Sequence, residues 1–271
     1  MITSFQWINT GYTTGYEWLT KGSGGWKKLI FPAYAGLLKH DTLGYILFDT
    51  GYGDSFKSAT KSFPYRLYRW VTPVFYDPAN GIVSRLKKLG IAVDQIRYIF
   101  LSHLHADHIG SLKEFPDAQL ICHEDCKNLL KKNDISLVQN GILPDLIPED
   151  FLSRTHFLSK ENAIADKYFG NSWTLFENDV KAVALPGHAV GQTGIQFNLE
   201  GKEIFLVADA TWFTSVIETK KMPHKMVSLI EDDWVNYQKT VSKLHDYGMA
   251  NPETIMIPSH CTEIKYPFTI D

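Results

Sequence analysis

The chain has 271 residues, of which 44% are hydrophobic, 13% aromatic and 21% charged, and its formal net charge is −3. This is enough apolar material for one large core or two small ones, and the balanced charge gives no basic face for nucleic acid. No apolar run approaches the roughly 20 residues of a membrane-spanning helix, and the first ten residues do not read as a signal peptide.

The number of cysteines indicates the redox environment of the protein. There are three, Cys122, Cys126 and Cys261, and an odd, sparse set argues against a disulfide scaffold. We therefore expect a cytoplasmic protein in which these cysteines pack in the interior rather than bind metal.

Apolar runs separated by turns predict an alternation of strands and helices. In chain order, we expect strands at 33–40 and 45–51, a helix at 81–90, strands at 96–102 and 118–123, a helix at 124–132, strands at 180–188, 193–199 and 203–210, a helix at about 229–247, and a strand at 254–260.

Two of these helices have recognisable ends or faces. In the first, Ile82, Leu86 and Leu89 share one side, and Gly90 can end the helix. The helix at 229–247 is preceded by Ser228, and Glu231 stands at the spacing of a capping box. The apolar stripe of this helix comprises Ile230, Trp234, Tyr237, Val241 and Leu244.

Two segments, 55–80 and 133–172, show little periodicity. Long irregular segments in a compact domain are usually lids or binding loops, so we expect both to be insertions that form pocket walls. The first contains aromatic residues at 63–76 interleaved with lysine and arginine. Such a stretch also suits a homodimer interface or a peripheral membrane contact, and these readings are compatible with a pocket wall.

The histidines of the chain are concentrated in "LSHLHADHIG" at 101–110, which supplies His103, His105, Asp107 and His108. A continuing strand would place 103, 105 and 107 on one face and 108 on the other. All four converge only if the chain turns just after Ser102. Imidazole and carboxylate groups suit zinc and related divalent metals, so this turn predicts a metal site.

Three more candidate ligands stand just beyond apolar runs. His188 follows "VKAVALPG", Asp209 follows "EIFLVA", and His260 follows "TIMIPS". Each alone is an ordinary residue at a strand end. Together with the four at 103–108 they form a set of seven ligands.

This ordered set, H-x-H-x-D-H followed by distant His, Asp and His, resembles the metallo-β-lactamase superfamily. "FDTGYG" at 48–53, "LPGHAVGQTG" at 185–194 and "VADA" at 207–210 resemble further motifs of that superfamily. The resemblance implies an α/β protein with the αβ/βα sandwich fold, in which two mixed sheets pack face to face with helices outside. We expect one such domain over residues 1–271.

The resemblance also implies roles for the ligands. His103, His105 and His188 would hold one metal, Asp107, His108 and His260 the second, and Asp209 would bridge them. Asp49 would orient a ligand histidine through a hydrogen bond. Two zinc ions sharing a hydroxide would then attack an ester or lactone carbonyl, with Asp107 as proton carrier.

Within the superfamily, the chain is most similar to quorum-quenching N-acyl-homoserine lactone lactonases. "GYILFDTGYGDSF" and "DQIRYIFLSHLHADH" carry this similarity, although Ile-Gly-Ser-Leu follows His108 where those enzymes commonly have two glycines and an asparagine. Tyr168 is the candidate for the tyrosine that contacts the substrate carbonyl in that family. The alternatives are another esterase, thioesterase or phosphodiesterase of the same fold, or a relative that binds ligands without turnover.

Overall fold

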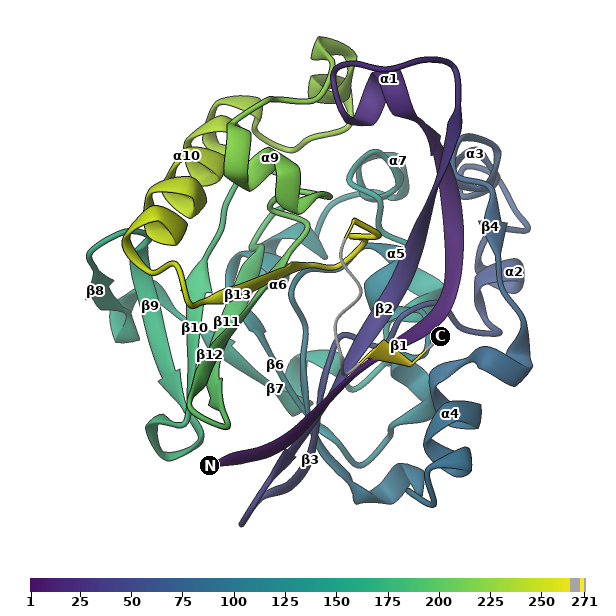
Figure 1. Cartoon of the computed structure of the whole chain (residues 1–271). Coiled ribbons are helices and arrows are strands. Elements are labelled where there is room, and N and C mark those ends of the chain that lie inside the picture. Colours follow the sequence, from purple (N-terminus) through teal and green to yellow (C-terminus); the bar gives the residue numbers. More distant parts are fainter. Residues whose placement is uncertain (264–268, 271) are drawn as a thin grey trace.

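A computed structural model describes residues 1–263 and 269–270. Two β-sheets face each other and helices cover their outer sides (Figure 1). This is the αβ/βα sandwich that the sequence predicts.

The first sheet has the strand order β14-β1-β2-β3-β5-β6-β7, with β4 paired to β1. Its strands are β1 (Ile2–Tyr16), β2 (Lys28–His40), β3 (Gly44–Phe48), β4 (Val74–Phe75), β5 (Ile96–Phe100), β6 (Gln119–His123), β7 (Thr155–Leu158) and β14 (Thr269–Ile270). Strands β1, β2 and β3 pair antiparallel, whereas β3, β5, β6 and β7 are parallel. The parallel strands therefore present their carboxyl ends at one edge of the sheet.

The second sheet has the order β13-β12-β11-β10-β9-β8. Its strands are β8 (Ile164–Asp166), β9 (Gly170–Leu175), β10 (Val180–Ala184), β11 (Thr193–Leu199), β12 (Lys202–Ala208) and β13 (Ile255–Pro258). Its pairs are antiparallel except for β12 and β13, which are parallel.

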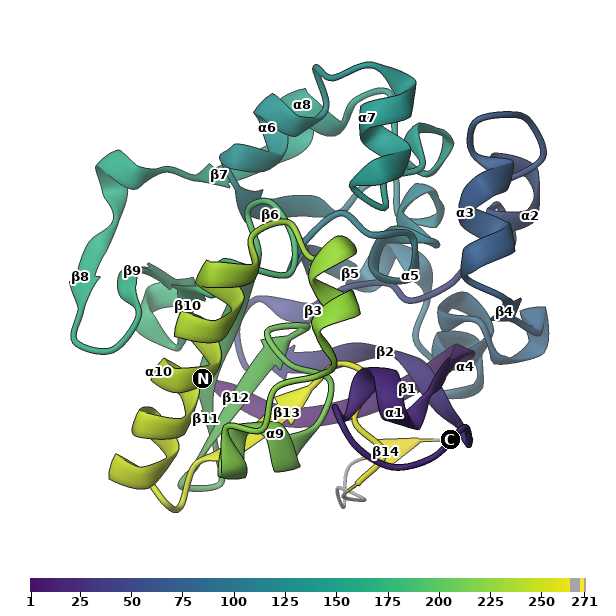
Figure 2. The same cartoon turned by 90° about the horizontal axis from the view of Figure 1, so that it is seen from above.

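Helices α4 and α6 pack on the outer side of the first sheet, and α9 and α10 on that of the second (Figures 1 and 2). The α-helices are α1 (Glu17–Thr20), α2 (Phe56–Ala59), α3 (Arg66–Val71), α4 (Ile82–Lys88), α5 (Ala106–Ile109), α6 (Asp125–Leu129), α7 (Asp134–Gln139), α8 (Phe151–Arg154), α9 (Thr214–Thr219) and α10 (Trp234–Ala250). Short 3-10 turns are η1 (Pro78–Asn80), η2 (Val93–Gln95), η3 (Leu112–Glu114), η4 (Pro144–Leu146), η5 (Lys160–Asn162), η6 (Phe176–Asn178) and η7 (Lys225–Leu229).

Strand β12 shows why the apolar runs lack alternation. Leu206 and Ala208 point into the core between the sheets, whereas Phe205 and Val207 point outward into the cluster that contains Leu244 of α10. Successive strand residues face opposite sides, so a strand covered on both sides is apolar throughout. Full burial of a Val, Leu or Phe side chain such as these contributes about 1.5–3 kcal/mol.

All eight predicted strands are present, with bounds that differ by a few residues, but the longest strand of the chain was missed. Strand β1 spans 15 residues, many of them polar or only half-buried, so its sequence lacks a clear apolar pattern. Its partner decides its structure, because β1 pairs with β2 along almost its whole length.

The expectation that the segments 55–80 and 133–172 are irregular was wrong, because both contain short helices and strands. The segment 133–172 contains α7, α8, β7, β8 and the start of β9, and the segment 55–80 contains α2, α3 and β4. These elements are too short, at two to six residues each, to produce a visible period within either segment.

The predicted start of the long helix was also wrong. Helix α10 begins five residues later than expected, and Asp233 caps it by accepting a hydrogen bond from the Asn236 backbone N–H at 2.9 Å. Ser228 lies in η7, Ile230 is exposed, and the Glu231 side chain turns into the interior. In the correctly predicted part of the stripe, Tyr237, Val241 and Leu244 are buried. In α4, by contrast, Leu89 is exposed although Ile82 and Leu86 are buried.

Gly187 allows α10 to pack against the loop that carries His188. Its φ is +138°, and a Cβ atom there would lie 2.3 Å from both the Cα and the N of Tyr237. The Asp233 backbone N–H also donates to Gly187 O at 2.8 Å. A side chain at this position would therefore push the helix away from the loop.

We expect Gly187→Ala to lower the free energy of unfolding by about 2 kcal/mol or more, because backbone atoms of α10 must move. Gly201→Ala is the matched control, since Gly201 also has positive φ, at +80°, but a Cβ there meets nothing within 4 Å. Urea denaturation of both variants measures the difference. Equal losses would mean that the contact with Tyr237 does not constrain the fold.

Candidate metal centre

The seven predicted ligands lie just beyond the carboxyl ends of strands from both sheets. The four at 103–108 follow β5, His188 follows β10, Asp209 follows β12, and His260 follows β13. Strands fix the backbone while the loops at their ends carry the polar side chains, a usual arrangement for a site. The structure brings all seven together.

The segment after β5 turns as the sequence required. Strand β5 ends at Phe100, and α5 starts at Ala106 with His105 in an extended conformation at its N-cap. The His108 backbone N–H donates to His105 O at 3.0 Å. This turn carries His108 to the same side as His103, His105 and Asp107, which a continuing strand could not do.

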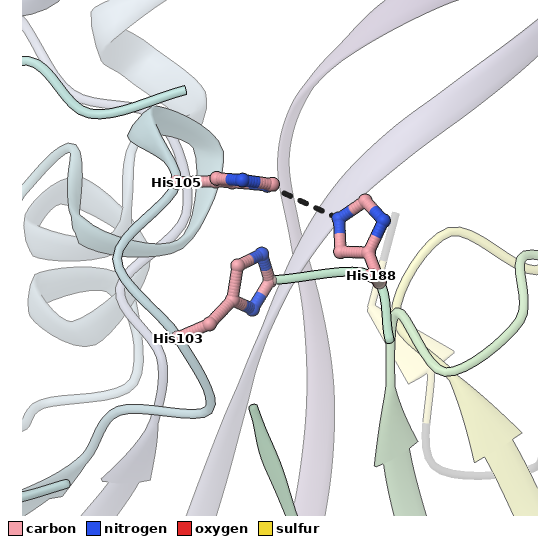
Figure 3. Close-up of side chains that lie close together, drawn as sticks. All are labelled: His103, His105 and His188. Carbon is pink, nitrogen blue, oxygen red and sulfur yellow. Dashed lines mark hydrogen bonds between the residues drawn. The ribbon is translucent and has the colours of Figure 1, made fainter. Parts of the chain in front are cut away.

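His103, His105 and His188 form the first group of donors. Their ring nitrogens lie within 4.8 Å of one another. His105 Nδ1 and His188 Nε2 are 3.1 Å apart, and Figure 3 shows the three rings facing a common point. The first two residues come from one sheet and the third from the other, so the group spans the sandwich.

Asp107, His108 and His260 form the second group. Asp107 Oδ2 lies 3.4 Å from His260 Nε2, and Asp107 Oδ1 lies 3.9 Å from His108 Nε2. These donor atoms also fall within 4.8 Å of one another.

Asp209 lies between the two groups. Its Oδ2 is 3.4 Å from His188 Nε2 and 2.9 Å from His260 Nε2, and its Oδ1 is 3.5 Å from His108 Nε2. The carboxylate therefore contacts histidines of both groups, as a residue that joins two metals must.

The donor atoms at the centre of the cluster fit metal ions. His103 Nε2, His108 Nε2 and Asp209 Oδ1 are shielded from solvent and have no hydrogen-bond partner among the described residues. An unsatisfied buried polar group costs about 1–3 kcal/mol, so native structures rarely keep several together without a ligand. Imidazole nitrogen and carboxylate oxygen are ligands that zinc accepts.

Burial and neighbouring charges shift the pKa values of these histidines in different directions. Burial, reinforced by adjacent histidines, holds the pKa of His103 and of His105 well below the usual range, which leaves both rings neutral. Burial also lowers the pKa of His260, but Asp209 outweighs it and raises the value. Burial raises the pKa of Asp209, but His260 and His108 outweigh it and hold this carboxylate ionised. The carboxylates thus supply the negative charge that cations need here.

Buried groups behind the ligands fix their orientation. Asp49 Oδ2 lies 2.7 Å from His108 Nδ1, as expected for a hydrogen bond to this candidate ligand. His260 Nδ1 donates to Pro32 O at 2.6 Å. In both rings the Nδ1 atom is engaged, so Nε2 faces the centre of the cluster.

Glu231 is the positioning residue that the sequence reasoning missed. Its Oε2 lies 2.9 Å from His188 Nδ1, and its side chain is fully buried. Burial lowers the pKa of His188, but the Glu231 carboxylate outweighs this and raises it. The capping-box spacing to Ser228 concealed this role, and an acidic residue before an otherwise apolar stripe was the only sequence signal.

Tyr168, the predicted pocket tyrosine, does not lie with the ligands. It occupies the turn between β8 and β9, where its ring packs against Tyr247 of α10 at 5.1 Å between centroids. Aromatic side chains beside the histidine cluster include Trp212, whose ring centroid is 6.2 Å from that of His188, and Phe31, at 6.5 Å from that of His260. Trp212 stands three residues after Asp209, a position that the sequence reasoning did not consider.

The cysteines take the packing roles expected of them. All three are free and buried, and Cys122 and Cys126 belong to the core cluster outside the first sheet. None of them contributes to a group of possible metal donors among the described residues.

Comparison with known proteins supports the same family. Residues 30–126 match the model of the Metallo-beta-lactamase superfamily. N-acyl homoserine lactonase AttM of Rhizobium radiobacter is 25% identical over 190 residues, which cover 66% of this chain and 64% of that protein. N-acyl homoserine lactonase AiiB of Agrobacterium fabrum is 26% identical over 190 residues, covering 65% and 61%. The matched region thus spans less than two thirds of these relatives.

Solved structures share the fold over nearly the whole chain. A mutant of Bacillus thuringiensis AiiA with N-decanoyl-L-homoserine bound at its active site superimposes with a TM-score of 0.73 at 18% identity, covering 97% of this chain and 95% of that one. AidC, a dizinc quorum-quenching lactonase, gives a TM-score of 0.67 at 18% identity, covering 98% and 93%.

Residues 30–126 of this chain are thus similar to the metallo-β-lactamase superfamily. The order of the candidate ligands and the two mixed sheets are consistent with this similarity. Within the described residues, no helix is long and apolar enough to cross a membrane.

We expect Glu231→Ala to weaken zinc binding by about 10–100-fold, because His188 loses the carboxylate that orients it. Glu231→Gln, which keeps an acceptor oxygen but loses the charge, should fall between the wild type and the alanine variant. Chelator competition measures the affinities. Asp232→Asn is the control, since this adjacent side chain is exposed. A loss as large for Asp232→Asn would show that charge near the site, and not the contact with His188, matters.

Proposed function

We propose that the protein is a dinuclear metal-dependent hydrolase that opens the lactone ring of N-acyl-homoserine lactones. The main support for two metal ions is the position of Asp209, whose carboxylate lies within 3.5 Å of histidines from both donor groups. The substrate class rests on the relatives, which are named N-acyl homoserine lactonases.

Two zinc ions are the proposed cofactors. His103, His105 and His188 would hold one, Asp107, His108 and His260 the other, and Asp209 would contact both. When bound, such ions lower the pKa of water to about 7 and polarise a carbonyl group. The chain's own contribution is a set of donors whose directions are fixed beforehand by Asp49, Pro32 and Glu231.

Asp107 is the proposed proton carrier. Its side chain is 13% exposed, against 4% for Asp209 and 0% for Asp49, so it is the carboxylate that substrate and water can reach. In lactone hydrolysis, water adds to the carbonyl carbon, the ring C–O bond breaks, and the leaving alkoxide takes up a proton. A carboxylate beside the reacting atoms can accept the proton of water and return it to that oxygen.

The surroundings of the cluster suit a substrate with an apolar portion. Trp212 packs beside His188 and against Phe31, at 5.8 Å between ring centroids. The turn after α7 closes over His105, because a Cβ at Gly141 would lie 2.6 Å from its Cδ2. An acyl chain can gain up to about 0.8 kcal/mol for each methylene that it buries against such walls.

Other carbonyl or phosphoryl substrates are the alternative within this fold, since the same ligands could serve a thioesterase or a phosphodiesterase. A relative that binds ligands without turnover is the third reading. The complete set of converging donors favours an enzyme over that reading. A cytoplasmic location, a homodimer and a single domain remain predictions from the sequence.

We expect Asp209→Ala to abolish hydrolysis and to reduce the zinc content from two ions per chain, because one carboxylate serves both groups. Asp49→Ala should cost only about 10–100-fold in activity, since this residue acts through His108. Metal analysis and kinetics of both variants, each with circular dichroism to confirm folding, provide the test. A folded Asp49→Ala variant with the greater loss of the two would contradict these roles.

We expect the zinc-loaded protein to hydrolyse acyl-homoserine lactones, with KM falling as the acyl chain lengthens until the apolar walls are filled. The measurement is a hydrolysis panel that also includes aryl esters, S-lactoylglutathione, a phosphodiester and a β-lactam. Turnover of the thioester or phosphodiester without hydrolysis of the lactones would contradict the proposed substrate class. It would not contradict the proposed metal centre.

A further inference from the structure

A cavity lies apart from the candidate metal centre. It has a volume of about 580 Å³, and none of the seven candidate metal ligands lines it. Its walls come from β1, the loop after β3, α2, α3, β4, η1 and α4. Figure 2 shows α3, β4 and α4 gathered on the side of the molecule away from β8 and α10. Its size is typical of small-molecule pockets, which fall at about 300–1,000 Å³.

Aromatic rings form the apolar part of this cavity. Tyr12 of β1 and Phe75 of β4 stack with 4.8 Å between centroids and 12° between planes, and both line it. Phe56, which is buried, and Tyr76 complete the aromatic wall. Flat parallel rings of this kind suit a planar or apolar ligand body.

Three cationic side chains also line the cavity: Lys57, Arg69 and Arg85. Among the described residues, none of the three takes part in an ion pair within 4.0 Å. Arg85 Nε is shielded from solvent and has no hydrogen-bond acceptor in the part of the chain that the structure describes. A shielded N–H without an acceptor is unfavourable, and an anion bound in the cavity would satisfy it.

The two acids of the cavity are already engaged by neighbouring donors. Asp77 Oδ1 accepts a hydrogen bond from the Ala79 backbone N–H at 3.0 Å. Burial, together with the charge of the nearby Asp54, raises the pKa of Tyr76 to about 12. The two acids keep their negative charge but form no ion pair with the three cations among the described residues, and the cations outnumber them, so the net charge of the lining is positive.

We propose that this cavity is a second binding site, which takes a small amphipathic anion. A carboxylate or phosphate head would bind to Arg85 and Arg69, and a planar apolar body would lie against Tyr12 and Phe75. The site is separate from the metal centre and does not depend on hydrolysis.

Isothermal titration of the zinc-loaded full-length protein with 2-naphthoate, 2-naphthyl phosphate and neutral 2-naphthamide tests this proposal. We expect saturable binding of at least one anion and binding of the amide weaker by about tenfold or more, since the amide lacks the charge. Whichever anion binds more tightly identifies the preferred head group. Absence of saturable binding for both anions, or equal affinity for naphthoate and naphthamide, would overturn the proposal.

Because a carboxylate could also bind at the metal centre, variants are needed to distinguish binding there from binding in this cavity. Arg85→Gln and Arg69→Gln should each weaken anion binding by about tenfold or more. Lys87→Gln is the matched control, because it removes the same charge from α4 at an exposed position outside the cavity. Arg69 is exposed, so Arg69→Gln should not affect folding. This variant therefore tests the site if Arg85→Gln fails to fold. Unchanged affinity in a folded Arg69→Gln variant would refute the site.

Discussion

The site depends on one buried carboxylate, that of Asp49. Its side chain is completely inaccessible to solvent, and its backbone adopts φ of +60°, which is uncommon for a residue other than glycine. The carboxylate accepts hydrogen bonds from the Ser102 backbone N–H at 2.8 Å and from the Ser102 hydroxyl at 2.7 Å, and it also lies 2.7 Å from His108 Nδ1. It thus holds the end of β3, the end of β5 and the first turn of α5 together.

A buried carboxylate is stable only when all of its partners are present. Removing one partner of such a pair typically costs about 3–5 kcal/mol, because the remaining charge is left uncompensated. The backbone reinforces the same junction, since the Thr50 N–H donates to His108 O at 2.7 Å and the Gly110 N–H donates to Gly51 O at 2.9 Å. The turn that collects four candidate ligands is therefore a rigid part of the fold.

The second sheet supplies the rest of the cluster, and its position is set by packing. The core between the sheets contains large side chains from both, among them Trp7, Phe48 and Phe100 facing Phe197 and Leu206. Close packing of this kind leaves little freedom in the distance between the sheets. The spacing of His188, Asp209 and His260 from the residues after β5 follows from it.

Sequence and tertiary structure determined different things about this protein. The ligand types, their order and the strands before them could be predicted, because a strand buried on both faces must be apolar and a metal requires particular side chains. Only tertiary structure determined that residues of β1 form a strand, because their half-polar sequence becomes extended through pairing with β2. It also decided that Glu231 orients His188 rather than capping a helix, and that Trp212 rather than Tyr168 stands beside the histidines. These outcomes depend on contacts between segments distant in the chain, and local periodicity carries no information about such contacts.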